Sequence, residues 1–152
     1  MAILPDPPAG RLDGTTHRFA IRVYFEDTDA GGIVYHANYL RWFERARMDL
    51  IGLLGIDQRM ALEERKGFYV VTDITIHYAR PARLDDAVVV ESTVTSVGAA
   101  SWRASHRALR ADELLAEAQA RIGFVGAGGR AERQPETWRK SLQSILIAES
   151  NR

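Results

Sequence analysis

Residues 25–39 read FEDTDAGGIVYHANY, and they join a segment of strand character to a segment of helical character. Before them, residues 17–25 alternate apolar and polar side chains, which predicts a strand. After them, residues 39–54 repeat apolar side chains at helical spacing, which predicts one long helix that Gly55 ends. The segment therefore predicts a strand, a glycine-containing turn and a helix entrance in succession.

The turn combines a carboxylate, two glycines and a histidine. Asp29 precedes Gly31 and Gly32, and His36 stands just before Asn38, the predicted helix N-cap. The first amides of a helix are unpaired and partly positive, so they can hold a developing oxyanion. This pattern fits hydrolysis, with Asp29 as base or nucleophile and His36 as polariser or proton carrier. An ordinary loop that hydrogen-bonds to its own backbone fits the same residues.

A longer segment of the sequence favours the hydrolytic site over the ordinary loop. RVYFEDTDAGGIVYHANY (residues 22–39), followed by FERAR (residues 43–47), closely resembles the 4-hydroxybenzoyl-CoA thioesterase family. Within that family it is most similar to the Tol–Pal-associated acyl-CoA thioesterases of Gram-negative bacteria. YARPARLDD (residues 78–86) resembles a segment of the same group. The resemblance covers about residues 17–125, which is most of the chain.

The rest of the chain predicts an α+β fold. Residues 58–66 predict a short polar helix or turn. Four strands then follow with short connections, over residues 68–78, 88–97, 101–110 and 114–125. The resemblance implies a hot dog fold, in which an antiparallel five-stranded sheet wraps around one long central helix.

The length of 152 residues predicts a single domain. Residues 1–16 are rich in proline and glycine, so we expect a flexible N-terminal lead-in. Residues 17–130 are predicted to form the hot dog thioesterase domain. Residues 131–152 are predicted to form a C-terminal extension, with an amphipathic helix at residues 137–149.

The resemblance also implies an activity and a set of site residues. It implies that the chain hydrolyses acyl-CoA thioesters to free acid and CoA without a metal. The catalytic carboxylate, as nucleophile or general base, falls on Asp29, and the second catalytic residue falls on His36. The amide at position 36 would bind the thioester oxygen, and Gly32, Val34 and Tyr35 would help to position the oxyanion or substrate.

Three features leave alternatives open. The related subgroup often has a tyrosine four residues before the catalytic aspartate, where this chain has Phe25. Some hot dog thioesterases use a carboxylate on the central helix, and Glu44 is therefore the alternative catalytic residue. By resemblance, Arg80 and Arg83 lie near the CoA nucleotide, whose phosphates suit arginine, although an ordinary charged loop explains them equally well.

Composition excludes several other classes. The chain has 20 basic and 20 acidic residues, so its formal charge of +0 predicts no general attraction to nucleic acid. It has no cysteine and no Gly-x-Ser-x-Gly motif, and its 4 histidines are far apart. We therefore expect no metal and no cofactor, because CoA is part of the substrate. With no signal pattern and no long apolar run, the sequence predicts a cytoplasmic protein without membrane insertion.

We expect a homodimer as the minimum unit, because association would cover exposed strand edges. The resemblance suggests that such dimers pair into a tetramer. The resemblance alone also suggests a partner in the cell envelope or in lipid synthesis. Two other functions remain open: a non-catalytic acyl-CoA-binding or scaffold protein, and a hot dog hydratase or dehydratase. The sequence does not predict whether the acyl chain is short, long or aromatic.

Overall fold

The computed structural model describes residues 1–148. Its elements follow in chain order: β1 (Arg11–Asp13), β2 (Thr16–Arg22), a short 3-10 turn (Phe25–Asp27), α1 (Asn38–Leu53), α2 (Gln58–Glu63), β3 (Phe68–Tyr78), β4 (Ala87–Val97), β5 (Ser101–Arg110), β6 (Glu113–Val125) and α3 (Glu136–Gln143). The end of the predicted C-terminal helix, at residue 149, and the end of the predicted extension lie outside the described residues.

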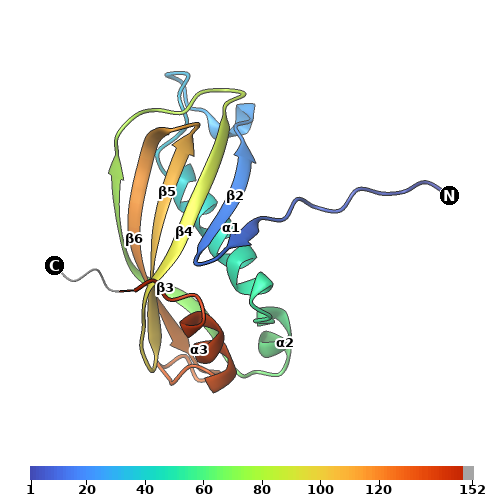
Figure 1. Ribbon diagram of the computed structural model, residues 1–152, viewed down its shortest axis with the longest axis vertical. Helices are drawn as coiled ribbons and strands as arrows, with labels where there is room; N and C mark the ends of the chain where they lie inside the picture. The colour runs from blue at the N-terminus through green and yellow to red at the C-terminus, as the bar shows by residue number, and fades with distance from the viewer. Residues whose placement is uncertain (149–152) are drawn as a thin grey trace.

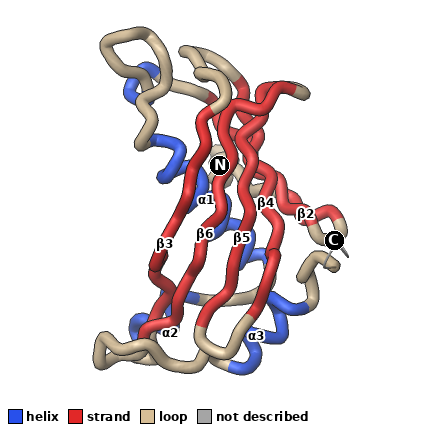
Figure 2. The backbone as a smooth tube through the Cα atoms, turned by 90° about the vertical axis from the view of Figure 1, so that its left-hand side faces the viewer, coloured by secondary structure: helices blue, strands red, loops and turns tan. Residues whose placement is uncertain are grey.

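The strands form one antiparallel sheet in the order β1-β2-β4-β5-β6-β3. The sheet curves around α1, which crosses one of its faces (Figures 1 and 2). This arrangement confirms the α+β hot dog prediction, but the sheet has six strands rather than five. The additional strand, β1, pairs with β2 across a turn at Gly14. The range expected to be lead-in, residues 1–16, therefore contributes to the sheet from Arg11 onward.

The core forms where α1 meets the sheet. The helix buries its large apolar side chains against the sheet, including Trp42, Phe43 and Leu50. The facing strands carry alanines in register, with Ala108 opposite Ala116 on β5 and β6. Such small side chains let the helix approach the sheet closely, which is how the chain fits one helix inside a curved sheet.

The end of α1 and the C-terminal helix α3 complete the fold around this core. Gly55 has a φ of +82° just after α1, and Ile56 N donates to Ile51 O at 3.0 Å, so the predicted helix stop is confirmed. Near the C-terminus, α3 packs Leu142 into the core beside Trp102. Within residues 1–148, no helix is long and apolar enough to cross a membrane.

Candidate active site

Asp29 lies at the start of a tight turn. Asp29 N donates to Ile33 O at 2.8 Å and Gly32 N donates to Asp29 O at 3.0 Å, while Gly32 adopts a φ of +81° that favours glycine. The Asp29 carboxylate is exposed, and its Oδ1 accepts a hydrogen bond from Gly31 N at 2.8 Å. Among the described residues it has no ion pair. The turn therefore presents an accessible carboxylate.

The entrance to α1 differs from the predicted cap. The helix begins at Asn38, and Ala37 occupies the N-cap position without a side-chain hydrogen bond. The Asn38 side chain instead donates through Nδ2 to Asp27 O at 2.8 Å. The predicted N-cap at Asn38 is wrong because tertiary contact with the preceding turn uses that side chain.

The backbone amides of the turn differ in what they donate to. Three of them already donate inside the chain: Gly32 to Asp29 O, Val34 to Ala82 O and Tyr35 to Asp27 O, at 3.0, 2.9 and 2.9 Å. These residues therefore shape the turn through their amides. The amide of His36 makes no hydrogen bond within residues 1–148. This amide lies two residues before α1, where the helix also favours negative charge, so a ligand oxygen can use it. The amide of Ala37 likewise has no acceptor among the described residues.

His36 is held by a residue that the sequence did not single out. Tyr78, at the end of β3, donates its hydroxyl to His36 O at 2.9 Å. The His36 ring stacks edge-on against the rings of Tyr35 and Tyr78, with centroids 4.6 and 6.2 Å apart. His36 is exposed, and no hydrogen bond joins it to Asp29 among the described residues. Tyr78 stands 42 residues from His36 in the chain, so only tertiary structure brings them together.

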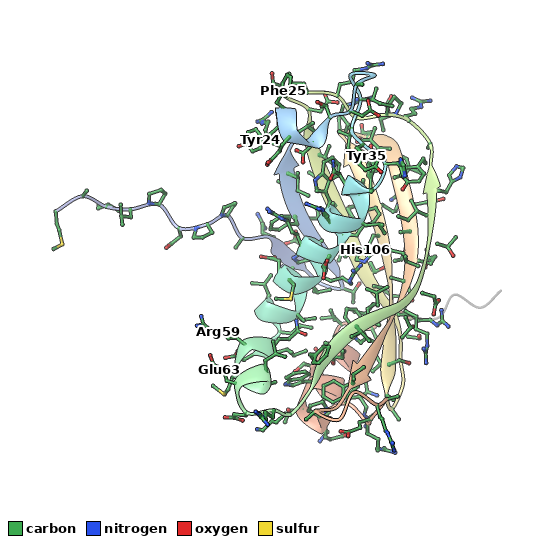
Figure 3. All side chains as sticks on the ribbon, turned by 180° about the vertical axis from the view of Figure 1, so that it is seen from behind. Tyr24, Phe25, Tyr35, Arg59, Glu63 and His106 are labelled. Carbon is green, nitrogen blue, oxygen red and sulfur yellow. The ribbon has the colours of Figure 1, made fainter. Side chains whose placement is uncertain are left out.

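The strand that precedes the turn is shorter than predicted. It ends at Arg22, and Phe25 begins a 3-10 turn, so the expectation that Tyr24 and Phe25 alternate on a strand is wrong. Both rings are exposed at the end of the molecule where α1 begins, near Tyr35 (Figure 3). Asp27 Oδ2 accepts a hydrogen bond from Tyr24 N at 2.8 Å, which stabilises the tighter turn.

The remaining predicted residues lie outside this turn. Glu44 is exposed on α1, beyond its first turn. Arg83 lies beside the Asp29 turn through a backbone bridge to Ile33, and its guanidinium has no ion pair within residues 1–148. Arg80 pairs with Glu113 at 2.6 Å. Of the two predicted CoA-binding arginines, Arg83 is therefore closer to the turn. Its guanidinium is also the one that no described carboxylate pairs with.

A buried polar band under α1 is the feature that sequence reasoning missed. His17, Ser92 and His106 face each other across β2, β4 and β5, and all are fully buried. His17 Nε2 contacts Asp49 Oδ2 at 2.6 Å, and His106 Nε2 contacts the Arg47 guanidinium at 3.1 Å. Figure 3 shows His106 between α1 and the sheet. A single buried histidine has no periodic signal, so the sequence offered no means to find this band.

Within residues 1–148, no three His, Cys, Asp or Glu side chains are arranged to hold a metal ion. The groups that the structure places at the turn are the Asp29 carboxylate, the His36 imidazole and the backbone amide of His36.

The family follows from sequence comparison. The sequence model of the thioesterase-like superfamily matches residues 23–146, which include the turn, α1 and the core of the sheet. The chain therefore belongs to the thioesterase-like superfamily, and the resemblance seen in its sequence is confirmed.

Individual relatives agree with this assignment. The chain is 42% identical to an acyl-CoA thioesterase YbgC from Haemophilus influenzae, over 72% of this chain and 81% of the relative. It is 39% identical to an acyl-CoA thioester hydrolase YbgC from Escherichia coli O6:H1, over 75% of this chain and 85% of the relative.

Solved structures support the fold. A probable thioesterase from Bartonella henselae superposes with a TM-score of 0.75 at 31% identity, covering 79% of this chain and 99% of that one. A mutant 4-hydroxybenzoyl-CoA thioesterase in complex with 4-hydroxybenzoyl-CoA superposes with a TM-score of 0.77, covering 84% of this chain and 99% of that one. Its 20% identity shows likeness of fold alone.

Proposed function

We propose that this chain hydrolyses acyl-CoA thioesters to a free acid and CoA, with Asp29 as the catalytic carboxylate. The observation that carries the proposal is the 42% identity to a curated acyl-CoA thioesterase over most of both chains. The geometry of the turn supports it, because Asp29 is accessible and the amide of His36 has no partner among the described residues.

The proposed chemistry uses only groups of the turn. The His36 amide donates to the thioester oxygen and stabilises the negative charge that develops there, an effect of about 3–4 kcal/mol for one such donor in known sites. Asp29 then attacks the carbonyl carbon and expels the CoA thiolate, leaving an acyl anhydride that water cleaves. Alternatively, Asp29 takes a proton from a water that attacks the same carbon. Both routes consume one water and give the same products.

His36 and Tyr78 support this chemistry in the proposal. The His36 imidazole polarises the thioester or carries a proton to the leaving thiolate. Tyr78 is a positioning residue, because its hydroxyl holds the carbonyl of His36 beside the proposed oxygen-binding amide. Arg83 contributes a cation for the phosphates of CoA.

The proposed assembly is a homodimer joined at β3. This strand pairs with β6 on one side and lies at the edge of the sheet on the other. Its 11 residues carry exposed apolar side chains, including Val71 and Tyr78. A long strand edge with exposed apolar side chains is normally covered in a stable protein, and a second copy of the same edge would cover it. Light scattering tests this directly, since a monomer at micromolar concentration would contradict it; a tetramer would be a pair of such dimers.

The function is tested by release of free thiol from short, long and aromatic acyl-CoAs. We expect release by the wild type and a loss of about 100-fold or more in Asp29→Asn, because a catalytic carboxylate contributes effects of that order. His36→Ala should cause a smaller loss. Asp112→Asn is the matched control, since it removes an exposed carboxylate from the turn between β5 and β6.

The outcomes separate the alternatives. Full activity in Asp29→Asn would contradict the assignment of Asp29 as the catalytic carboxylate. Glu44→Gln would then be the next variant to measure. Binding of acyl-CoA without release of thiol would indicate a non-catalytic binding protein. A change in a carbon–carbon double bond with the thioester intact would indicate a hydratase or dehydratase.

A further inference from the structure

A cavity of about 380 Å³ opens between α1 and the far end of the sheet. Apolar side chains of α1, β3, β5 and β6 form most of its wall, including Ile51, Val71, Trp102 and Ile122. Its volume falls in the range of small-molecule sites, and its apolar wall with a few polar groups is typical of them. Among the polar groups in this wall, the Arg47 guanidinium and the Trp102 indole N–H are unusual in their partners.

Arg47 is the first of these groups. It is 7% exposed, and burial lowers the pKa of its guanidinium. Its one hydrogen bond runs to His106 Nε2 at 3.1 Å, and no carboxylate lies within 4.0 Å of it among the described residues. Buried cations in proteins are normally paired with an anion, because removing a charge from water costs several kcal/mol.

His106 cannot supply the missing negative charge. Burial, together with the charge of Arg47, lowers the pKa of His106 to about 3, so this ring is neutral at pH 7. Because arginine only donates, Nε2 of His106 accepts, and Nδ1 carries the proton that it donates to Ser92 Oγ at 2.7 Å. The charge of Arg47 therefore remains without a counter-ion.

Trp102 is a second side chain of the cavity wall with an unusual polar group. It is 1% exposed, and its Nε1 is buried without a hydrogen-bond partner within residues 1–148. Buried donors of this kind are nearly always satisfied by protein, water or ligand. The Trp102 N–H is enclosed by the protein rather than open to the cavity, so the group that suits an anionic oxygen there is the Arg47 cation.

Glu44 is the rival partner for Arg47. It precedes Arg47 by less than one helical turn, and it raises the pKa of Arg47 against the effect of burial. However, Glu44 is exposed and lines an adjacent surface groove as well as the cavity. It lies more than 4.0 Å from the guanidinium, since no ion pair joins them among the described residues.

Within one chain the cavity lies far from the Asp29 turn. The turn is attached to the Tyr78 end of β3, whereas the cavity lies at Val70 and Val71 near the other end. From Val70 to Tyr78 the strand extends about 27 Å. Antiparallel pairing of two β3 edges reverses this relation, because it sets the Val70 end of one copy beside the Tyr78 end of the other. In the proposed dimer, each cavity thus faces the catalytic turn of the second copy.

We propose that this cavity receives the far end of the acyl group and that Arg47 selects acyl chains that end in a carboxylate. This inference rests on the proposed function for the identity of the CoA ester. Arg47 binds the terminal carboxylate, while the apolar wall, which includes the Trp102 ring, accepts the methylene groups. The cavity thus favours the CoA half-esters of dicarboxylic acids over simple fatty acyl-CoAs.

The test is equilibrium binding of two stable CoA thioethers to the full chain, measured by calorimetry. One carries a six-carbon chain that ends in a methyl group, and the other a chain of equal length that ends in a carboxylate. We expect the carboxylate form to bind about ten- to hundred-fold more tightly to the wild type, as a hydrogen-bonded charge pair implies. Equal dissociation constants for the two thioethers would overturn the inference.

A variant and its control assign the preference to Arg47. Arg47→Met should bring the two dissociation constants within about two-fold of each other, because it removes the charge and keeps an apolar side chain of similar length. Arg45→Met is the matched control, since Arg45 is exposed on α1 outside the cavity, and it should keep the full preference. If Arg47→Met fails to fold, the comparison of the two thioethers on the wild type still tests the inference.

The remaining outcomes are also decisive. A preference that emerges only in Glu44→Gln would make Glu44 the counter-ion of Arg47 and overturn the inference. Because the thioethers are not hydrolysed, the carboxylate preference is measured independently of turnover. If the chain prefers the carboxylate thioether but releases no thiol from acyl-CoAs, only the proposed hydrolysis is contradicted. If it releases thiol but does not prefer the carboxylate thioether, only this inference is contradicted.

Discussion

The stability of this protein should depend on pH through His106. This ring is fully buried, stacks on Phe43 with centroids 5.1 Å apart, and bonds to Arg47 and Ser92. His17 lies nearby across the sheet and opposes its protonation as well. Burial is the main cause that lowers the pKa of His106 to about 3.

The size of the effect follows from proton linkage. An unfolded histidine has a pKa of about 6.5. Between that value and about 3 the unfolded chain binds more protons than the folded chain, so the free energy of unfolding falls as the pH falls. Each pH unit within this window costs about 1.4 kcal/mol, so lowering the pH from 7 to 5 should cost about 2 kcal/mol. For a domain of this length that corresponds to about 4–8 °C in melting temperature.

The assay compares denaturant unfolding of the wild type and His106→Gln at pH 7 and pH 5. Glutamine can still accept from Arg47 and donate to Ser92, but it does not titrate. The wild type should therefore lose about 2 kcal/mol more than the variant between these pH values. Protomer concentration is held fixed because association shifts apparent stability. Equal losses in both proteins, or a native His106 resonance that titrates near pH 6.5, would refute the reasoning.

Three further substitutions test other contacts. Tyr78→Phe removes the hydroxyl that holds the turn, so kcat should fall several-fold and unfolding should cost about 1 kcal/mol less, as measured by kinetics and denaturant titration. Gly67→Ala should lower the free energy of unfolding by about 2 kcal/mol or more, because a Cβ would lie 2.3 Å from Val125 O and the φ of +125° is unfavourable; an unchanged melting temperature would contradict this. Arg83→Ala should raise KM for acyl-CoA more than Arg80→Ala does, because Arg80 is already in an ion pair, and equal effects would remove Arg83 from the CoA site.

The turn that carries Asp29 and His36 was readable from the sequence because its residues are close together in the chain. Asp29, the glycines and His36 lie within eight residues, and the structure keeps them in one turn before α1. The strands and the long helix were also predictable, because alternation and helical spacing of apolar side chains are patterns of nearby residues. Gly55 marked the end of that helix. The cap at Asn38 failed because its side chain bonds to Asp27 instead.

Consecutive residues encode local conformation. The sequence by itself therefore determined the order of strands and helix, the position of the turn, and the family that the chain resembles. Only the tertiary structure decided that Tyr78 supports His36, that β1 joins the sheet, and that Arg47 and Trp102 line one cavity. The physical reason is that these relations depend on strand register and on burial. Register and burial arise from contacts between segments far apart in the chain, which no local period records.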